Sequence, residues 1–161
     1  MKTMYYLVDG YNVIFADASL AKYMQNQPET ARKQLLQKLY NLYVHKRQHS
    51  VVVFDGQMGV IEKEKSPPGV KVIFSKGTNA DNKIRNIVKT ADDTSQITVV
   101  SSDYKDIGIY VKSSVKNVIS AQEFLEILGE VEHKHKGKPE KPESISEEEI
   151  NYWLKEFGEI D

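Results

Sequence analysis

Cysteine is absent from the 161-residue sequence, which excludes disulfide bonds, thiolate nucleophiles and cysteine-ligated zinc sites. Long apolar runs are absent too, because none approaches the ~20 residues that a membrane-spanning helix needs. The apolar run near the amino terminus is too short for the core of a signal peptide. We therefore expect a soluble, cytoplasmic protein.

A strong excess of charge of one sign is also missing. The chain carries 22 Lys and Arg residues against 23 Asp and Glu residues, for a net charge of -1. Proteins that coat nucleic acid depend on a large basic excess, so this balance disfavours that class. It remains compatible with an enzyme that acts on nucleic acid, because local basic patches can surround an acidic pocket.

Two common catalytic motifs are missing as well. The sequence contains neither the G-x-x-x-x-G-K-[ST] phosphate loop nor the G-x-S-x-G nucleophile motif. A basic group from His45 to His49 lies at the end of a predicted helix, where the helix dipole favours positive charge. A solvated helix end is its expected role, and phosphate binding is the alternative.

Three short apolar runs are each followed by an aspartate. The runs and their acids are Tyr5–Val8 with Asp9, Val51–Phe54 with Asp55, and Ile97–Val100 with Asp103 beyond two serines. Each run has the composition of a buried strand. The carboxyl ends of parallel strands meet at one edge, where open α/β sheets bind their ligands. Carboxylates gathered there repel one another unless a cation lies among them.

Helical patterns separate these strands. The other predicted elements are helices that begin at Pro28, at Thr78 or Asn79 and at the Ser120–Glu123 capping box, and strands over Val70–Phe74 and Val115–Ile119. Strands that alternate with helices predict an α/β fold with a central, mostly parallel sheet flanked by helices on both faces.

The composition changes after residue 131. Residues 132–144 are rich in charge and contain Pro139 and Pro142, which predicts a flexible linker. Residues 145–161 include the capping signal Ser146–Glu149 and an apolar face, which predicts a C-terminal helix. We therefore divide the chain into a domain of residues 1–131, the linker and this helix.

Five aspartates are the candidate metal ligands. Asp9, Asp81 and Asp103 form the main set, with Asp106 beside them and Asp55 as a weaker candidate. Carboxylate oxygens suit Mg²⁺ or Mn²⁺. Such an ion polarises a phosphoryl oxygen and activates a water, so hydrolysis of a phosphodiester is the reaction that fits best. For each aspartate taken alone, capping a turn or a helix is the structural alternative.

Five blocks of this sequence resemble, in order, the motifs of the NYN-domain ribonucleases, and most of all their bacterial YacP-like branch. The blocks are Val8–Ile14, Val53–Gly56, Val72–Lys76, Asn79–Ile84 and Val99–Tyr104, within a match from about Met4 to Leu128. The resemblance implies a PIN-like three-layer fold and a metal-dependent endoribonuclease that uses Mg²⁺ or Mn²⁺. It assigns catalysis to Asp9, Asn12, Asp81 and Asp103.

The resemblance also implies that RNA is the partner. Some relatives act in association with ribosomes, so mRNA on the ribosome is a candidate substrate. Four side chains beside the acids are candidate RNA contacts: Tyr11 and Tyr104 by stacking on bases, and Lys76 and Lys105 by attracting phosphates. Core packing of the tyrosines and solvation of the lysines are the structural alternatives.

The sequence departs from the family pattern around Asp81. Gly77 and Asn82 occupy a block in which the family often carries further acids. This leaves open whether one or two metal ions bind. It also leaves open a PIN-like module that binds RNA or the ribosome without cutting, and an enzyme that acts on a small phosphate compound.

Overall fold

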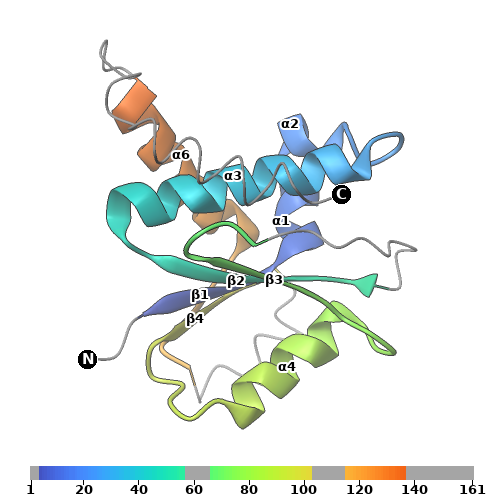
Figure 1. Ribbon diagram of the computed structural model, residues 1–161, viewed down its shortest axis with the longest axis vertical. Helices are drawn as coiled ribbons and strands as arrows, with labels where there is room; N and C mark the ends of the chain where they lie inside the picture. Colours follow the sequence, from blue (N-terminus) through green and yellow to red (C-terminus); the bar gives the residue numbers. More distant parts are fainter. Residues whose placement is uncertain (1–3, 57–65, 103–114, 137–161) are drawn as a thin grey trace.

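A five-stranded parallel sheet forms the centre of the protein (Figure 1). The computed structural model describes residues 4–56, 66–102 and 115–136. The strands are β1 (Tyr5–Asp9), β2 (His49–Phe54), β3 (Val70–Phe74), β4 (Ile97–Val100) and β5 (Asn117–Ile119), in the spatial order β3-β2-β1-β4-β5. Every neighbouring pair is parallel, so the carboxyl ends of all the strands point to the same edge.

Helices cover both faces of the sheet. The helices are α1 (Gly10–Ala16), α2 (Ala18–Ala21), α3 (Pro28–Lys46), α4 (Ala80–Thr90) and α6 (Ala121–Lys136). Of these described helices, Figure 1 shows α4 on one face and α1, α2, α3 and α6 on the opposite face. This is the predicted α/β arrangement of three layers.

Two hydrophobic cores fill the spaces between the layers. Residues of β1 alternate between them, because successive side chains of a strand point to opposite faces. Tyr6 and Val8 belong to the core beneath α1, α3 and α6, while Leu7 belongs to the core beneath α4. Burial on both faces explains why the central strands are nearly continuous apolar runs. The sheet therefore holds its strand ends in fixed positions.

The predicted helix starts are confirmed. Helix α3 begins at Pro28, and Asn79 is the N-cap of α4. The Ser120 hydroxyl oxygen accepts a hydrogen bond from the Glu123 N–H at 3.1 Å, and the Glu123 carboxylate accepts one from the Ser120 N–H at 2.8 Å. These two bonds are the predicted capping box.

The structure differs from the prediction at the start of strand β5 and at the end of helix α6. Strand β5 begins at Asn117, not at Val115. Helix α6 continues to Lys136, so residues 132–136 of the predicted linker are helical. Their Glu and Lys residues favour a helix, and an ion pair of 2.8 Å between Glu132 and Lys38 ties α6 to α3.

The rest of the predicted linker, 137–144, and the predicted helix over 145–161 lie outside the described residues. Among the helices that the structure describes, none combines the length and the apolar character that a bilayer crossing requires.

Candidate active site at the carboxyl edge of the sheet

Asp9 lies at the centre of the carboxyl edge. It is the last residue of β1, which pairs with β2 on one side and β4 on the other. Asp55 follows β2 directly, and Ser101 and Ser102 follow β4. The three apolar runs that precede aspartates are therefore neighbouring parallel strands, as predicted. The Asp9 side chain is 9% exposed, so the surrounding elements restrict its direction.

Helix α1 begins immediately after Asp9. Asp9 occupies the N-cap position, but its side chain makes no capping hydrogen bond to the helix. Capping of α1, the structural alternative for this acid, is therefore not its role. The helix can start here because Gly10 has no side chain: a Cβ at this position would lie 2.4 Å from the Phe54 ring.

Asn12 connects α1 to the end of β4. Its Oδ1 accepts a hydrogen bond from the Ser102 N–H at 2.9 Å, and the Ser102 hydroxyl accepts one from the Ala121 N–H at 3.1 Å. Asn12 thus fixes the chain at the residue that precedes Asp103. Because the amide oxygen serves this contact, the amide N–H groups are the donors that Asn12 can offer a ligand.

Asp81 lies in the first turn of α4, where the sequence predicted it. Capping there is performed by Asn79, whose Oδ1 accepts from the Asn82 N–H at 2.8 Å. The Asn82 amide donates to Thr78 at 3.0 Å and accepts from Arg85 at 2.6 Å. This residue therefore has a structural role within α4.

Ser75 ties the start of α4 to the same edge. Its hydroxyl accepts from the Gly56 N–H at 3.0 Å and donates to the Thr78 carbonyl at 2.8 Å. Sequence reasoning missed this residue, although Ser75 follows β3 just as Asp55 follows β2, with Phe54 and Phe74 in register. The two bonds link the residue after Asp55 to the turn that leads to Asp81.

Part of the predicted metal and RNA site lies outside the described residues, namely Asp103, Tyr104, Lys105 and Asp106. Among the residues that are described, no three acids or histidines are grouped so that they could hold an ion. Asp9 and Asp81 supply the hard oxygen donors that Mg²⁺ and Mn²⁺ require. The complete ligand set remains a prediction.

Tyr11 is a core residue, which favours the packing alternative over the predicted stacking on RNA. Its side chain is 6% exposed, and its ring lies 5.0 Å from the ring of Phe54. Its hydroxyl accepts from the Arg32 guanidinium at 3.3 Å, and Arg32 itself lies over the Phe74 ring. No ring face of Tyr11 is therefore open to a base. Lys76, by contrast, is exposed at the carboxyl edge directly after Ser75.

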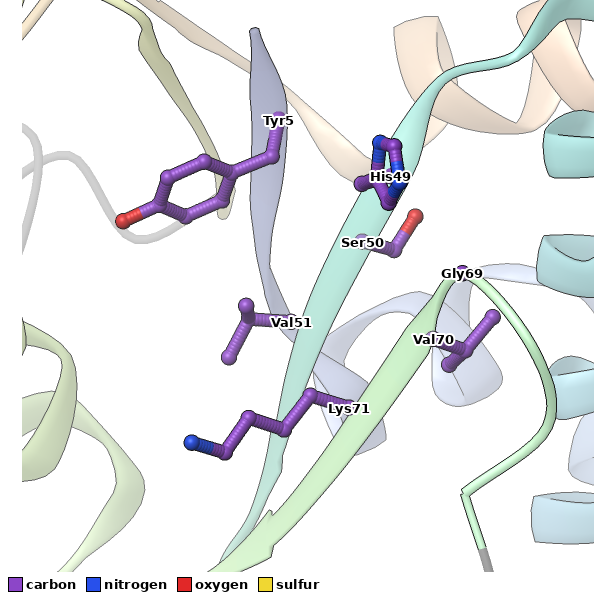
Figure 2. Close-up of a pocket in the computed structure, with 7 residues that line it drawn as sticks. All are labelled: Tyr5, His49, Ser50, Val51, Gly69, Val70 and Lys71. Atoms are coloured by element: carbon purple, nitrogen blue, oxygen red, sulfur yellow. The ribbon is translucent and has the colours of Figure 1, made fainter. Parts of the chain in front are cut away.

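A cavity of about 440 Å³ lies at the opposite, amino edge of the sheet. It is lined by residues at or near the starts of three strands: Tyr5, His49, Ser50, Val51, Gly69, Val70 and Lys71. Figure 2 shows the side chains of Tyr5, Val51 and Lys71 projecting to the same side of these strands. Burial raises the pKa of the Tyr5 hydroxyl above its usual value. This cavity is separate from the site around Asp9, and the sequence did not predict it.

Polar and acidic residues follow the central strands of this parallel sheet. The fold is therefore that of an open α/β domain, a class that binds its ligands at the carboxyl edge of the sheet. The chain belongs to the YacP-like NYN domain family, whose model matches residues 6–157. This match runs through the residues predicted as linker and into the predicted C-terminal helix.

Relatives of known sequence or structure agree with this assignment. The uncharacterized protein YacP of Bacillus subtilis is 35% identical over 103 residues, which make up 62% of this chain and 61% of that protein. The crystal structure of a mutant of Rae1 (YacP) from Bacillus subtilis matches with a TM-score of 0.73 and 28% identity, over 96% of this chain and 92% of the other. A second Rae1 (YacP) structure matches with a TM-score of 0.71 and 30% identity, over 83% and 77% of the two chains.

Proposed function

We propose that this protein is a metal-dependent endoribonuclease that hydrolyses RNA phosphodiester bonds at the carboxyl edge of its sheet. The observation that carries the proposal is the position of Asp9. It is a buried carboxylate at the end of the central strand, between two strands that are themselves followed by Asp55 and by Ser101 and Ser102. Membership of a nuclease-like family supports the same reading.

The proposed ligands of the metal ion are the carboxylates of Asp9, Asp81 and Asp103, with Asp106 as a further candidate. A bound Mg²⁺ or Mn²⁺ supplies a Lewis acid for the phosphate and a water of lowered pKa. The backbone of Asp9 is fixed by the end of β1 and the start of α1. Asp81 lies in the first turn of α4, where Asn79 performs the capping.

Asn12 and Lys76 act on the RNA in this proposal. With its oxygen bonded to Ser102, the Asn12 amide directs its N–H groups to a non-bridging phosphate oxygen. Lys76 is exposed at the same edge and attracts the phosphate backbone electrostatically. Tyr104 and Lys105 follow Asp103 in the chain and are proposed to contact the neighbouring nucleotides.

A cleavage assay tests the proposal. Single-stranded RNA of mixed sequence is incubated with the protein and Mg²⁺ or Mn²⁺, with EDTA as one control. We expect metal-dependent cutting that falls by at least about a hundredfold in Asp9→Asn, since even the outer-shell partners of metal sites contribute up to about that factor. Asp92→Asn is the matched control, because Asp92 is an exposed acid near the start of β4, at the other edge.

The ribosome enters the same test as a second substrate. If free RNA is not cut, the assay is repeated on mRNA in translating ribosomes. Cutting on ribosomes alone would identify the ribosome as a required partner. Absence of cutting in both assays, with a folded protein and added metal, would contradict the proposed activity.

A second function, an RNA- or ribosome-binding module without catalysis, is favoured by one observation. Asn82 forms side-chain hydrogen bonds with Thr78 and Arg85 at a position where the resemblance leads us to expect a further acid. A reduced set of acids would bind fewer ions. Retained RNA binding without any metal-dependent cutting would support the binding module.

A further inference from the structure

Phe15 is an exposed aromatic residue on α1. Its side chain is 55% exposed, and it is the one large hydrophobic residue that is exposed among those the structure describes. A single exposed apolar residue is common on protein surfaces. The position of Phe15, on the helix that starts directly after Asp9, is what suggests a role.

The geometry of α1 places Phe15 beside Asn12. The buried residues of this helix are Gly10, Tyr11, Val13 and Ile14. Residues three apart on a helix lie on the same face, so Asn12 and Phe15 share the face that remains. At 1.5 Å of rise per residue, Phe15 lies about 9 Å along the helix axis beyond Asp9.

Asn12 indicates where this face is directed. Its contact with Ser102 places it against the end of β4, at the carboxyl edge of the sheet. Phe15 therefore lies on an open surface about one helical turn from a residue of the candidate site. A strand of RNA whose phosphate reaches Asp9 and Asn12 would pass within reach of this ring.

We propose that Phe15 is a stacking platform for a base of single-stranded RNA, close to the phosphate that is cut. This inference rests on the proposed function and deepens it by naming a substrate contact. An exposed aromatic ring stacks on the π-face of any base, so it adds affinity without selecting a sequence. Larger purine bases gain more from the contact than pyrimidines do. Phe15 thus takes the role that the sequence assigned to the buried Tyr11.

The experiment measures binding in the Asp9→Asn background, in which the RNA stays intact. The probe is a fluorescently labelled oligoadenylate of about a dozen nucleotides, within the range of single-strand binding sites. Phe15→Ala is compared with Phe15→Trp, which keeps an aromatic ring, and with Phe15→Leu, which keeps only apolar volume. An oligonucleotide with abasic positions on the same sugar–phosphate backbone is the second probe.

We expect Phe15→Ala and Phe15→Leu to weaken oligoadenylate binding about tenfold, a loss typical of one base stack. Phe15→Trp should bind as well as the parent protein, and the abasic probe should not distinguish any of the variants. In protein with Asp9 intact, Phe15→Ala should raise KM and leave kcat nearly unchanged, as expected when ground-state binding is lost.

Equal binding of oligoadenylate by the parent and Phe15→Ala would overturn the inference. So would full restoration by Phe15→Leu, or an equal loss with the abasic probe, because either result would identify a hydrophobic contact other than stacking. Absence of oligoadenylate binding by the parent would overturn the stacking inference alone, because the nuclease proposal is tested separately by cleavage of free RNA and of mRNA on ribosomes. Binding that depends on an aromatic residue 15, without any cleavage, would support the stacking and contradict the nuclease activity.

Discussion

The two edges of the sheet are built differently. At the carboxyl edge, side-chain hydrogen bonds join separate elements, from Asn12 to Ser102 and from Ser75 to Gly56 and Thr78. At the amino edge lies a cavity of about 440 Å³, and the His49 Nδ1 and Ser50 Oγ atoms beside it are buried without a hydrogen-bond partner among the described residues. The cavity therefore lies at the edge where these two buried polar atoms have no partner among the described residues.

This comparison shows that a surface cavity and the candidate functional site can lie at different edges of the sheet. The cavity follows from the way in which three strand starts and the turn before β3 pack together. The carboxyl edge owes its character to the residues that follow each strand, and the bonds between them hold these residues in place before any ligand binds. Such preorganisation lowers the cost of binding a charged substrate.

Asp81→Asn should have the largest effect of these substitutions at the carboxyl edge, with a large loss of RNA cleavage and little loss of folding stability. We expect metal-dependent RNA cleavage to fall by at least about a hundredfold, since even the outer-shell partners of metal sites contribute up to about that factor. The free energy of unfolding should fall by no more than about 1 kcal/mol, because Asn79 caps α4 and the substitution removes only a charge from its first turn. The paired variant is Asn79→Ala, which should lose about 1 kcal/mol of stability. Cleavage kinetics and urea denaturation measure the two effects. A large loss of stability in Asp81→Asn would show that this acid is structural.

Substitution of one glycine at each edge compares how much the two edges contribute to folding stability. Gly10 lies at the carboxyl edge and Gly69 at the amino edge. Gly69 has a φ of +78°, and a Cβ there would lie 2.2 Å from the Tyr43 ring, while a Cβ at Gly10 would meet the Phe54 ring at 2.4 Å. We expect Gly69→Ala to lose about 2 kcal/mol or more, since steric overlap adds to backbone strain. Gly10→Ala should lose about 1–3 kcal/mol from overlap alone.

Gly10→Ala and Gly69→Ala also distinguish an effect on folding stability from an effect on RNA cleavage. Measured under conditions where both variants are folded, only Gly10→Ala should reduce RNA cleavage, because only Gly10 adjoins Asp9. Reduced cleavage by folded Gly69→Ala would mean that the amino edge contributes to the reaction.

Ser50→Ala should have the smallest effect. The buried hydroxyl has no partner among the described residues, and its removal relieves a desolvation penalty. We expect the free energy of unfolding to stay the same or to rise by up to about 1 kcal/mol, without any change in RNA cleavage. A clear loss of stability in urea denaturation would show that this hydroxyl has a bonding partner.

The fold could be predicted from the sequence because its signals are local. Buried parallel strands require continuous apolar runs, such as Ile97–Val100, and helices need recognisable first turns, such as Pro28 and the Ser120–Glu123 box. The parallel order followed from the alternation of these elements. The end of α6 was missed because charged residues that suit a linker also suit an exposed helix.

The candidate site could be predicted only in part. The position of Asp9 followed from its place after an apolar run. The burial of Tyr11 and the exposure of Phe15 did not, because both belong to one apolar stretch and only the orientation of α1 distinguishes them. The Ser75 contacts and the amino-edge cavity depend on packing between distant segments, which spacing along the chain does not reveal.

The place of β1 at the centre of the sheet has a consequence for biosynthesis. Its neighbours are β2, which is made soon after it, and β4, which ends only at Val100. A nascent chain that stops before β4 leaves one side of β1 without its partner strand, and Asn12 without Ser102. Contacts of such long sequence separation form late in folding. A growing chain therefore cannot complete this edge until most of the domain has been synthesised, so the proposed activity would begin only after β4 has paired with β1.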